Sequence, residues 1–379
     1  MDEQLLEKLI SLRQELHRYP EVSGQEKQTA ERIKRFVAEY QPDEIIEGIG
    51  TYGLAFVFDS QKPGPISLFR SELDALPIEE INNFPWKSVM SGASHKCGHD
   101  GHMVMIAGLA DYLHHNPPKR GKVILMYQPE EETGTGALKI LQDKRFRDLS
   151  PDYVFALHNL PNVPLGEIRC REDVFAAASV GMIMRIKGKT SHAAQPEKGI
   201  SPAGALAKLI QMMEGLVGKT KLSDFALITP VFARLGEKAF GTTPGYAELM
   251  ATIRSYRNVD LDTLKKSTSA NADEIAKSYG LSIEFEWVEA FSASVNHKKA
   301  VGMIKTAAQK NKLKYQHIPE PNRWSEDFGY FLDEYPGAIF GLGAGLDMPE
   351  LHNPDYDFPE RLIPKGVHVF QSIIQQINQ

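Results

Sequence analysis

A cysteine and a histidine lie two residues apart in a short, glycine-containing segment and together could bind a metal ion. The segment reads Cys97-Gly98-His99-Asp100-Gly101-His102. Thiolate and imidazole groups are donors that zinc and related ions accept, and the glycines let the backbone bend so that both side chains point at one centre. The alternative is a polar loop in which Asp100 caps the next helix, and this pair alone does not decide between the two.

Three consecutive glutamates, Glu130, Glu131 and Glu132, form an acidic cluster between Gln128-Pro129 and a glycine-rich stretch. Adjacent carboxylates repel one another, which is costly unless cations or protons compensate them. In a hydrolytic metal centre, one carboxylate binds metal while its neighbour accepts a proton from water. The alternative is the acidic start of a helix, which the helix dipole favours.

Two further histidines are candidates. His158 follows an apolar run, and His352 lies in a loop. Taken singly, each is explained as well by a core histidine or an ordinary loop residue. Together with Cys97, His99 and one or two of the glutamates, they make a ligand set for two metal ions that share a water. Such pairs of ions, roughly 3.5–4 Å apart, recur in aminopeptidases and other hydrolases.

A further candidate, His192, lies in the segment Thr190-Ser191-His192-Ala193-Ala194-Gln195-Pro196. As a residue that does not bind metal, it could donate a hydrogen bond to the oxyanion that forms when water attacks an amide carbonyl. The alternative is a surface or capping loop.

Several of these polar residues follow short apolar runs that read as strands. The runs cover 54–58, 66–69, 123–127 and 153–157; a predicted helix at 29–40 precedes them, and helical stretches such as 102–113 separate them. This alternation predicts a three-layer α/β domain. Glu72 and Asp74 follow the second run, the glutamates follow the third, and His158 follows the fourth. Functional groups gather beyond the carboxyl ends of strands in open α/β sheets, so we expect these side chains at one edge.

The pattern changes from about residue 179. Strands are predicted over 180–186, 225–232, 246–253 and 283–287, with helices over 202–216 and 261–279. The order βαββαβ is that of the ferredoxin-like unit, whose ends can lie close together. We therefore predict an inserted ferredoxin-like domain at 179–290 within a discontinuous α/β domain, built on a mixed sheet, at 1–178 and 291–379.

Composition narrows the range of partners. The net charge is −6 with no basic block, which argues against nucleic acid or an anionic membrane as the main partner. The first residues lack the pattern of a signal peptide and no apolar run is long enough to span a bilayer, so we expect a cytoplasmic protein. The chain has two cysteines, Cys97 and Cys170, so a disulfide framework is not expected.

Seven blocks in register along nearly the whole chain resemble the metallopeptidase family of aminoacylases, hippurate hydrolases, auxin-conjugate hydrolases and N-acetyldiaminopimelate deacetylases. The blocks are Arg70-Ser71-Glu72-Leu73-Asp74-Ala75-Leu76-Pro77, 97–102, Gln128-Pro129 with the glutamates, Ala156-Leu157-His158, 191–196, Ser325-Glu326-Asp327-Phe328 and Leu351-His352. Their common order makes the resemblance specific.

The resemblance implies a role for each candidate. The implied metal ligands are Cys97, His99, Glu132, His158 and His352. Glu131 becomes the general base. Glu130 is the glutamate least expected to be essential, because other members often have a small residue there. The inserted domain is expected to mediate homodimerisation, with His192 reaching the active site of the partner subunit. Arg254 matches an arginine that helps to bind substrate in the family, although a charge on a strand surface explains it equally well.

The implied activity is hydrolysis of the amide bond in a small N-acyl amino acid, with two divalent metal ions per subunit. Zinc, manganese, cobalt and nickel all remain open, because mixed N/O/S sites accept each of them. Gly241-Thr242-Thr243-Pro244 and Trp324-Ser325 depart from the family pattern at places expected to face substrate, so the usual amino-acid part is not assumed.

Three alternatives remain from the sequence. A dipeptidase or carboxypeptidase would attack the same chemical group. A thiol hydrolase would use Cys97 as nucleophile with a nearby histidine as base, but would have no need for the glutamates. A binding protein on the same scaffold would lack turnover.

Overall fold

The computed structural model describes residues 1–379, which divide into two compact units. The first unit comprises Met1–Phe175, Ser294–Glu320 and Asp327–Gln379, and the second comprises Ala176–Ala293 and Pro321–Glu326. The expected borders at 178/179 and 290/291 therefore differ from the structure by three residues each. The segment Pro321–Glu326, expected in the first domain, joins the second unit, where Ala177 donates its backbone N–H to the carbonyls of Asn322 and Trp324.

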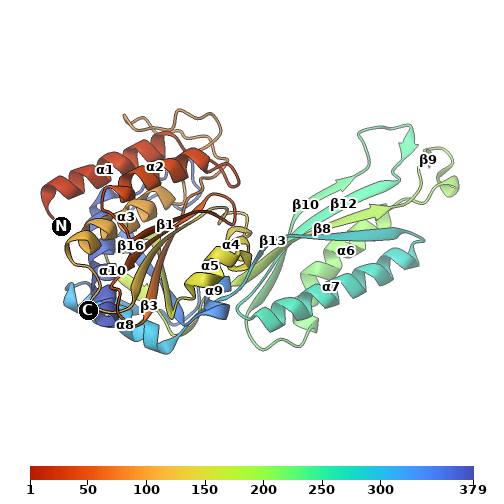
Figure 1. Ribbon diagram of the computed structural model, residues 1–379. Helices are drawn as coiled ribbons and strands as arrows, with labels where there is room; N and C mark the ends of the chain where they lie inside the picture. Colours follow the sequence, from red (N-terminus) through yellow and green to blue (C-terminus); the bar gives the residue numbers. More distant parts are fainter. The chain divides into compact units, whose positions relative to one another are not determined.

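The first unit is built on one large mixed sheet (Figure 1). The strand order is β1-β2-β4-β3-β5-β16-β6-β15. Strands β3, β4, β5 and β16 run parallel to their neighbours at the centre, whereas β1, β2 and β6 make the antiparallel pairs. The strands are β1 (Glu44–Ile49), β2 (Gly53–Asp59), β3 (Ile66–Glu72), β4 (Lys122–Gln128), β5 (Tyr153–Pro161), β6 (Ile168–Cys170), β15 (Tyr315–His317) and β16 (Gly337–Gly345), with a separate short pair of β7 (Asp173–Ala176) and β14 (Ser294–Asn296).

Helices make the other two layers of this unit. One group packs together around α3 and the other around α4, which gives the expected three-layer arrangement (Figure 1). The first group is α1 (Glu3–Arg18), α2 (Lys27–Ala38), α3 (His99–His115), α8 (Lys298–Lys310) and α10 (Ile363–Asn378); the second is α4 (Gly136–Gln142), α5 (Lys144–Leu149) and α9 (Gly329–Glu334). No helix in the structure combines the length and the apolar character that a membrane crossing requires.

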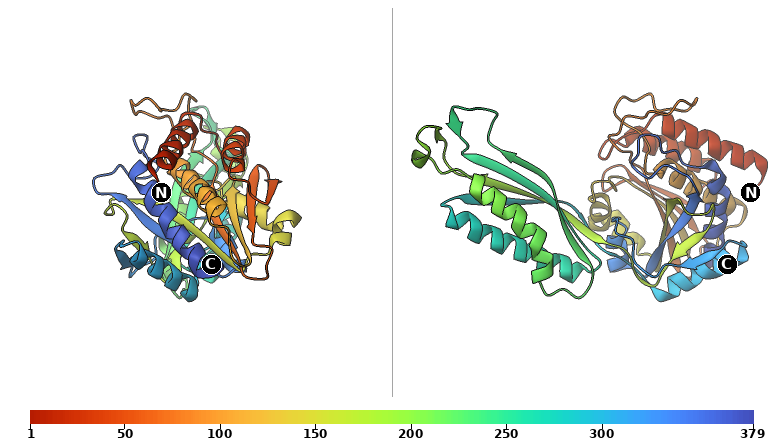
Figure 2. Two further views of the ribbon diagram at one scale, coloured as in Figure 1. Left: turned by 60° about the vertical axis from the view of Figure 1, so that its left-hand side comes forward. Right: turned by 180° about the vertical axis from the view of Figure 1, so that it is seen from behind.

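The second unit has the expected βαββαβ order, and its sheet is antiparallel throughout, in the order β10-β12-β8-β13. Alternate residues of β8, such as Met182 and Met184, are almost completely buried, as a sheet covered on one face requires. Helices α6 and α7 pack side by side on that sheet (Figure 2). The elements are β8 (Ala178–Lys187), β9 (Ser191–His192), η1 (Pro196–Lys198), α6 (Ala203–Leu216), η2 (Val217–Lys219), β10 (Ala226–Leu235), β11 (Thr242–Thr243), β12 (Tyr246–Ser255), α7 (Asn258–Ser278) and β13 (Ser282–Phe291).

A buried ionic cluster ties α1 to the start of α3. Arg13 is completely buried, and its Nε lies 2.8 Å from the Asp100 carboxylate, which also contacts His17 Nδ1 at 2.8 Å. On its other side, His17 Nε2 lies 3.0 Å from Glu80, which pairs in turn with Lys96. These contacts hold the segment that precedes α3 against the first helix. Asp100 does not cap α3, because Gly98 is the N-cap residue and no side-chain cap hydrogen bond forms; Asp100 neutralises a buried guanidinium instead.

Replacing Arg13 with leucine should lower the free energy of unfolding by about 3–5 kcal/mol, because Asp100 would keep a buried charge without its guanidinium partner. Urea unfolding at pH 7 measures this loss. The matched control is Arg32→Ala, whose partner Glu15 is about half exposed, and whose loss should stay below about 1 kcal/mol. An Arg13 variant as stable as the control would contradict the assigned role.

Candidate metal centre

The carboxyl ends of three parallel strands bring the acidic and histidine side chains to one edge of the large sheet. Glu72 at the end of β3 is paired in register with Gln128 at the end of β4. Phe69 of β3 lies opposite Phe155 of β5, so both strands extend three residues further before they reach Glu72 and His158. The side chains therefore converge at this edge, as the sequence pattern predicted, but Glu72 is the last residue of β3 and His158 lies within β5, because both strands are longer than the apolar runs that predicted them.

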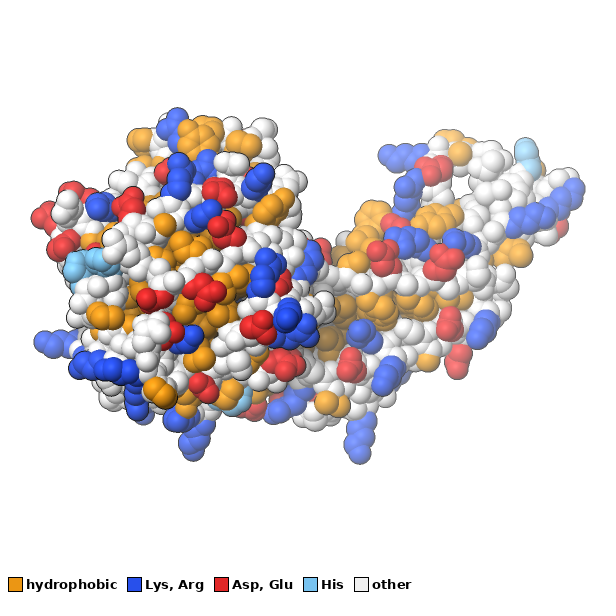
Figure 3. Space-filling view, viewed as in Figure 1, with side chains coloured by type: hydrophobic (Ala, Val, Ile, Leu, Met, Phe, Trp, Pro, Cys, Tyr) orange, Lys and Arg blue, Asp and Glu red, His pale blue; other side chains and the backbone are white.

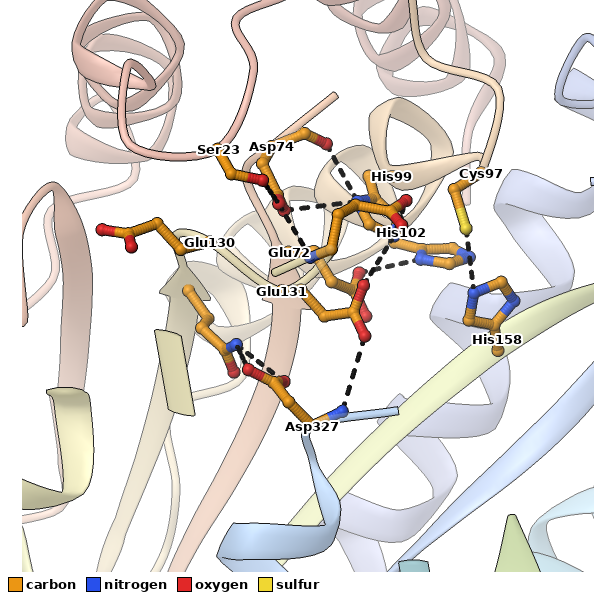
Figure 4. A network of polar contacts seen from close by, with 12 residues as sticks. Ser23, Glu72, Asp74, Cys97, His99, His102, Glu130, Glu131, His158 and Asp327 are labelled. Carbon is orange, nitrogen blue, oxygen red and sulfur yellow. Dashed lines mark hydrogen bonds and ion pairs between the residues drawn. The ribbon is translucent and has the colours of Figure 1, made fainter. Parts of the chain in front are cut away.

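The five predicted metal ligands lie in one cluster, and Figure 4 shows three of them, Cys97, His99 and His158. Cys97 Sγ lies 3.4 Å from His158 Nε2, and Glu132 lies 3.9 Å from His99 Nε2 and 3.7 Å from His352 Nε2. Potential donor atoms lie within 4.8 Å of one another in each of three overlapping groups: Cys97, His99 and His158; Cys97, Glu132 and His352; His99, Glu131 and Glu132. These distances are short enough for two cations to share the donors between them.

His99 is the first residue of α3, not a loop residue ahead of the helix as we expected from the sequence. The helix begins there because Gly98 has a φ of +91°, a conformation that glycine adopts without strain. The Nδ1 atom of His99 lies 2.9 Å from the carbonyl oxygen of Asp74. Its Nε2 atom is buried without a hydrogen-bond partner and points into the cluster. A metal ligand needs one ring nitrogen oriented and the other free, as here.

The backbone directs the three glutamate side chains to different places. Glu130 has a φ of +56°, and its carboxylate pairs with Lys139 and accepts hydrogen bonds from Thr51 and Thr135 at 3.0 and 2.9 Å. Figure 4 shows it turned away from Glu131, whose Oε2 lies 3.7 Å from His99 Nε2. The neighbouring residues Glu131 and Glu132 thus face the cluster, and Glu130 does not.

The electrostatics of the cluster suit a cation. Burial lowers the pKa of His99, but the negative charge of Glu72 and a hydrogen bond with Asp74 outweigh it and raise the pKa to about 10. Burial, followed by the charges of Glu132 and Glu131, raises the pKa of the Cys97 thiol well above its usual value. The raised pKa of His99 reports a strong negative potential, whereas the raised pKa of Cys97 reports burial first and this potential second. Divalent cations would relieve this potential and would favour the thiolate, so the donor set fits a metal pair.

Three residues around the cluster were given no role from the sequence. Asp74 holds His99 and accepts hydrogen bonds from Ser23 Oγ at 2.7 Å and Glu132 N at 3.0 Å. His102 lies 2.8 Å from Glu72, and Asn159 lies 2.5 Å from the other ring nitrogen of His102. The place of Asp74 just after a predicted strand indicated that it would lie near the site. No spacing in the sequence indicated the same for Asn159.

His192 and Arg254 belong to the second unit. His192 is exposed in the short strand β9, which pairs with β11 so that His192 faces Thr242 across the pair. Arg254, on β12, donates hydrogen bonds to the carbonyl of Arg323 at 3.1 Å and to Ser325 Oγ at 2.9 Å. Arg254 therefore holds the Pro321–Glu326 segment in this unit, a contact that the sequence did not predict.

Comparison with known proteins identifies relatives over the full length of this chain. Residues 68–376 match the model of peptidase family M20/M25/M40. An N-acetyl-L-cysteine deacetylase of Bacillus subtilis is 30% identical over 363 residues, covering 96% of this chain and 86% of the relative. An N-acetyldiaminopimelate deacetylase of Lactobacillus helveticus is 29% identical, covering 97% and 96%.

Solved structures share the fold. A Bacillus subtilis protein described as a dinuclear metal-binding peptidase of family M20 superposes with a TM-score of 0.83 at 27% identity, covering 99% of this chain and 98% of that one. A protein from methicillin-resistant Staphylococcus aureus has a TM-score of 0.87 at 23% identity over the full length of both chains, which shows the fold alone.

Replacing His99 with alanine should reduce the metal content of the purified chain, because the oriented ring nitrogen at the centre of the cluster is lost. Elemental analysis after dialysis against zinc or manganese measures the metal per chain. His115→Ala is the matched control, since this histidine ends the same helix and is 66% exposed. Equal metal content in the two variants would argue against His99 as a ligand.

Proposed function

Because the chain belongs to peptidase family M20/M25/M40, we propose that it is a metal-dependent amidohydrolase that cleaves small N-acyl amino acids. The observation that carries this proposal is the convergence of Cys97, His99, Glu132, His158 and His352 beside Glu131. These six residues come from four segments that are far apart in the sequence, and a purely structural role does not call for such a donor set.

Two divalent ions are the cofactor that best fits the cluster. Cys97, His99, Glu132, His158 and His352 would hold them, and zinc, manganese, cobalt and nickel all accept such mixed donors. When bound, the ions would lower the pKa of a shared water and polarise the substrate carbonyl. The description of the Bacillus subtilis structure as dinuclear supports the number of ions.

Glu131 is the proposed general base. Its carboxylate faces the donors without being needed as one of the five, and the backbone N–H of Asp327 lies 3.5 Å from its Oε1. From this place it can take a proton from the attacking water and later deliver that proton to the leaving amine. Such a shuttle needs a carboxylate that is held in position and partly shielded from solvent, and Glu131 is buried.

An N-acyl amino acid is the substrate class that the relatives favour, since the similar Bacillus and Lactobacillus proteins are named as deacetylases of N-acetylated amino acids. A dipeptidase activity would use the same groups. A panel of N-acetyl, N-benzoyl and dipeptide substrates distinguishes these activities. A thiol mechanism is disfavoured, because the raised pKa of buried Cys97 opposes a free thiolate nucleophile.

A homodimer is the proposed assembly, with His192 stabilising the oxyanion in the partner's active site. Strand β10 lies at the edge of its sheet and pairs only with β12. It exposes Val231 at 59% and Phe232 at 45%, and Figure 3 shows hydrophobic side chains on the surface of this unit. A long apolar edge invites pairing with another chain, and a second copy would cover it.

Changing Glu131 to glutamine should leave both metal ions bound and lower kcat by at least about 100-fold, because the amide cannot shuttle the proton. Steady-state assays on N-acetyl amino acids, paired with metal analysis, measure both effects. The matched control is the adjacent Glu130→Gln, which alters a carboxylate that faces Lys139. Near-normal turnover by the Glu131 variant would refute its role as base.

Changing Val231 to lysine should convert the dimer to a monomer, because the charge would be buried at the paired edge. Light scattering with size-exclusion chromatography measures the mass, and a parallel assay should show reduced turnover if His192 acts across the interface. Val89→Lys, at a residue 54% exposed in the first unit, is the control. A wild-type monomer with full activity would exclude both the dimer and the shared site.

A further inference from the structure

Asn159 is a completely buried residue that directly follows the proposed ligand His158 on β5. Its carbonyl oxygen lies 2.9 Å from His158 Nδ1 and can accept that ring N–H. This contact leaves His158 Nε2 facing Cys97 at 3.4 Å. The backbone of Asn159 thereby selects which nitrogen of His158 is available as a metal donor.

The side chain of Asn159 makes two further short contacts, one with each end of its amide group. Its Oδ1 lies 2.5 Å from His102 Nε2, on helix α3, which begins at His99. Its Nδ2 lies 2.5 Å from the hydroxyl of Tyr356 and donates to it. Tyr356 is also completely buried. One amide therefore joins the strand of His158 to the helix of His99.

Tyr356 belongs to the same loop as His352. The carbonyl of Tyr356 accepts a hydrogen bond from Lys96 Nζ at 2.8 Å, and the carbonyl of Lys96 accepts the backbone N–H of His352 at 2.9 Å. Lys96 immediately precedes Cys97. The segment that carries Cys97 is therefore fastened to the His352 loop at two points, and Asn159 reaches that loop through the Tyr356 hydroxyl.

Gly98 brings the loop between Cys97 and His99 directly over Asn159. A Cβ atom at Gly98 would lie only 2.6 Å from Asn159 Oδ1, closer than side-chain atoms approach one another. The absence of a side chain at Gly98 thus lets the amide fill the space beneath this loop. Asn159 therefore contacts the segment that supplies Cys97 and His99 and, through Tyr356, the loop that supplies His352, besides holding His158 itself.

We propose that Asn159, acting with Tyr356, is a positioning residue that sets the spacing of the ligands around the metal pair. This inference rests on the proposed metal centre and adds the group that aligns it. Ligands must be held to within about 0.5 Å for two ions to share a water productively. Cys97 with His99, His158 and His352 come from three separate segments, and they meet that tolerance only if those segments are fixed to one another. The Asn159 amide is where the three segments meet.

The test compares metal binding by Asn159→Ala and Tyr356→Phe with binding by the wild-type chain. Competition with a chelator for Zn²⁺ gives the affinity for each of two ions, and we expect one or both to weaken by about 10–100-fold. In the Co²⁺-loaded chain, the charge-transfer absorption of the Cys97 thiolate should shift or weaken, because the geometry around the ion is less well fixed. Neither readout depends on turnover.

The matched control is Tyr127→Phe, which also removes one hydroxyl from a completely buried tyrosine. This hydroxyl donates to a backbone carbonyl of α3 at 3.4 Å and does not contact Asn159. It should keep wild-type Zn²⁺ affinity and Co²⁺ absorption even if it lowers stability. Tyr356→Phe keeps the ring in place, so the proposal stays testable if the Asn159 variant fails to fold.

Two outcomes would overturn the proposal in different ways. If the wild-type chain binds metal and the folded variants have the same Zn²⁺ affinity and Co²⁺ absorption, the positioning role of Asn159 is rejected. The proposed metal centre is then still supported. A wild-type chain that binds neither Zn²⁺ nor Co²⁺ would reject the metal centre, and the positioning role with it.

Discussion

Carboxylates gathered at one buried edge of the large sheet repel one another, and the contacts around that edge compensate this repulsion. Glu72, Asp74, Glu131 and Glu132 all lie near His99, and the resulting negative potential raises the pKa of that histidine to about 10. Such a concentration of charge is stable only with strong compensation. Part of the compensation is internal, because Arg70 pairs with both Glu72 and Asp327. A metal pair would supply the remainder at the place where the proposed chemistry needs it.

The scaffold around this edge is correspondingly rigid. Gly98 starts α3 at His99, and the Arg13 cluster holds the preceding segment against α1. Each of these contacts involves a fully buried charge or a conformation that few residues adopt. Buried polar networks of this kind have few alternative arrangements, since any movement would leave a charge or a donor without a partner.

The second unit contributes a different set of constraints. Its sheet has one covered face and an apolar edge strand, and Arg254 fastens the returning Pro321–Glu326 segment to it. That segment is continuous with Asp327, which belongs to the first unit and binds Arg70. The chain thus passes from the second unit directly into the buried ionic network of the first unit. The residues Trp324 and Ser325, which depart from the family pattern, lie in the Pro321–Glu326 segment that makes this connection.

The sequence alone determined the donor types, their order and the βαββαβ unit, because spacing and apolar periodicity are local properties that survive in one dimension. It also indicated that the polar residues directly after three apolar runs, 66–69, 123–127 and 153–157, would converge, since parallel strands share a carboxyl edge. Only the tertiary structure decided that Glu130 faces Lys139, that His99 opens α3, and that Asn159 contacts segments distant in the sequence. Those features depend on backbone angles and on packing between residues far apart along the chain, and no local pattern encodes either.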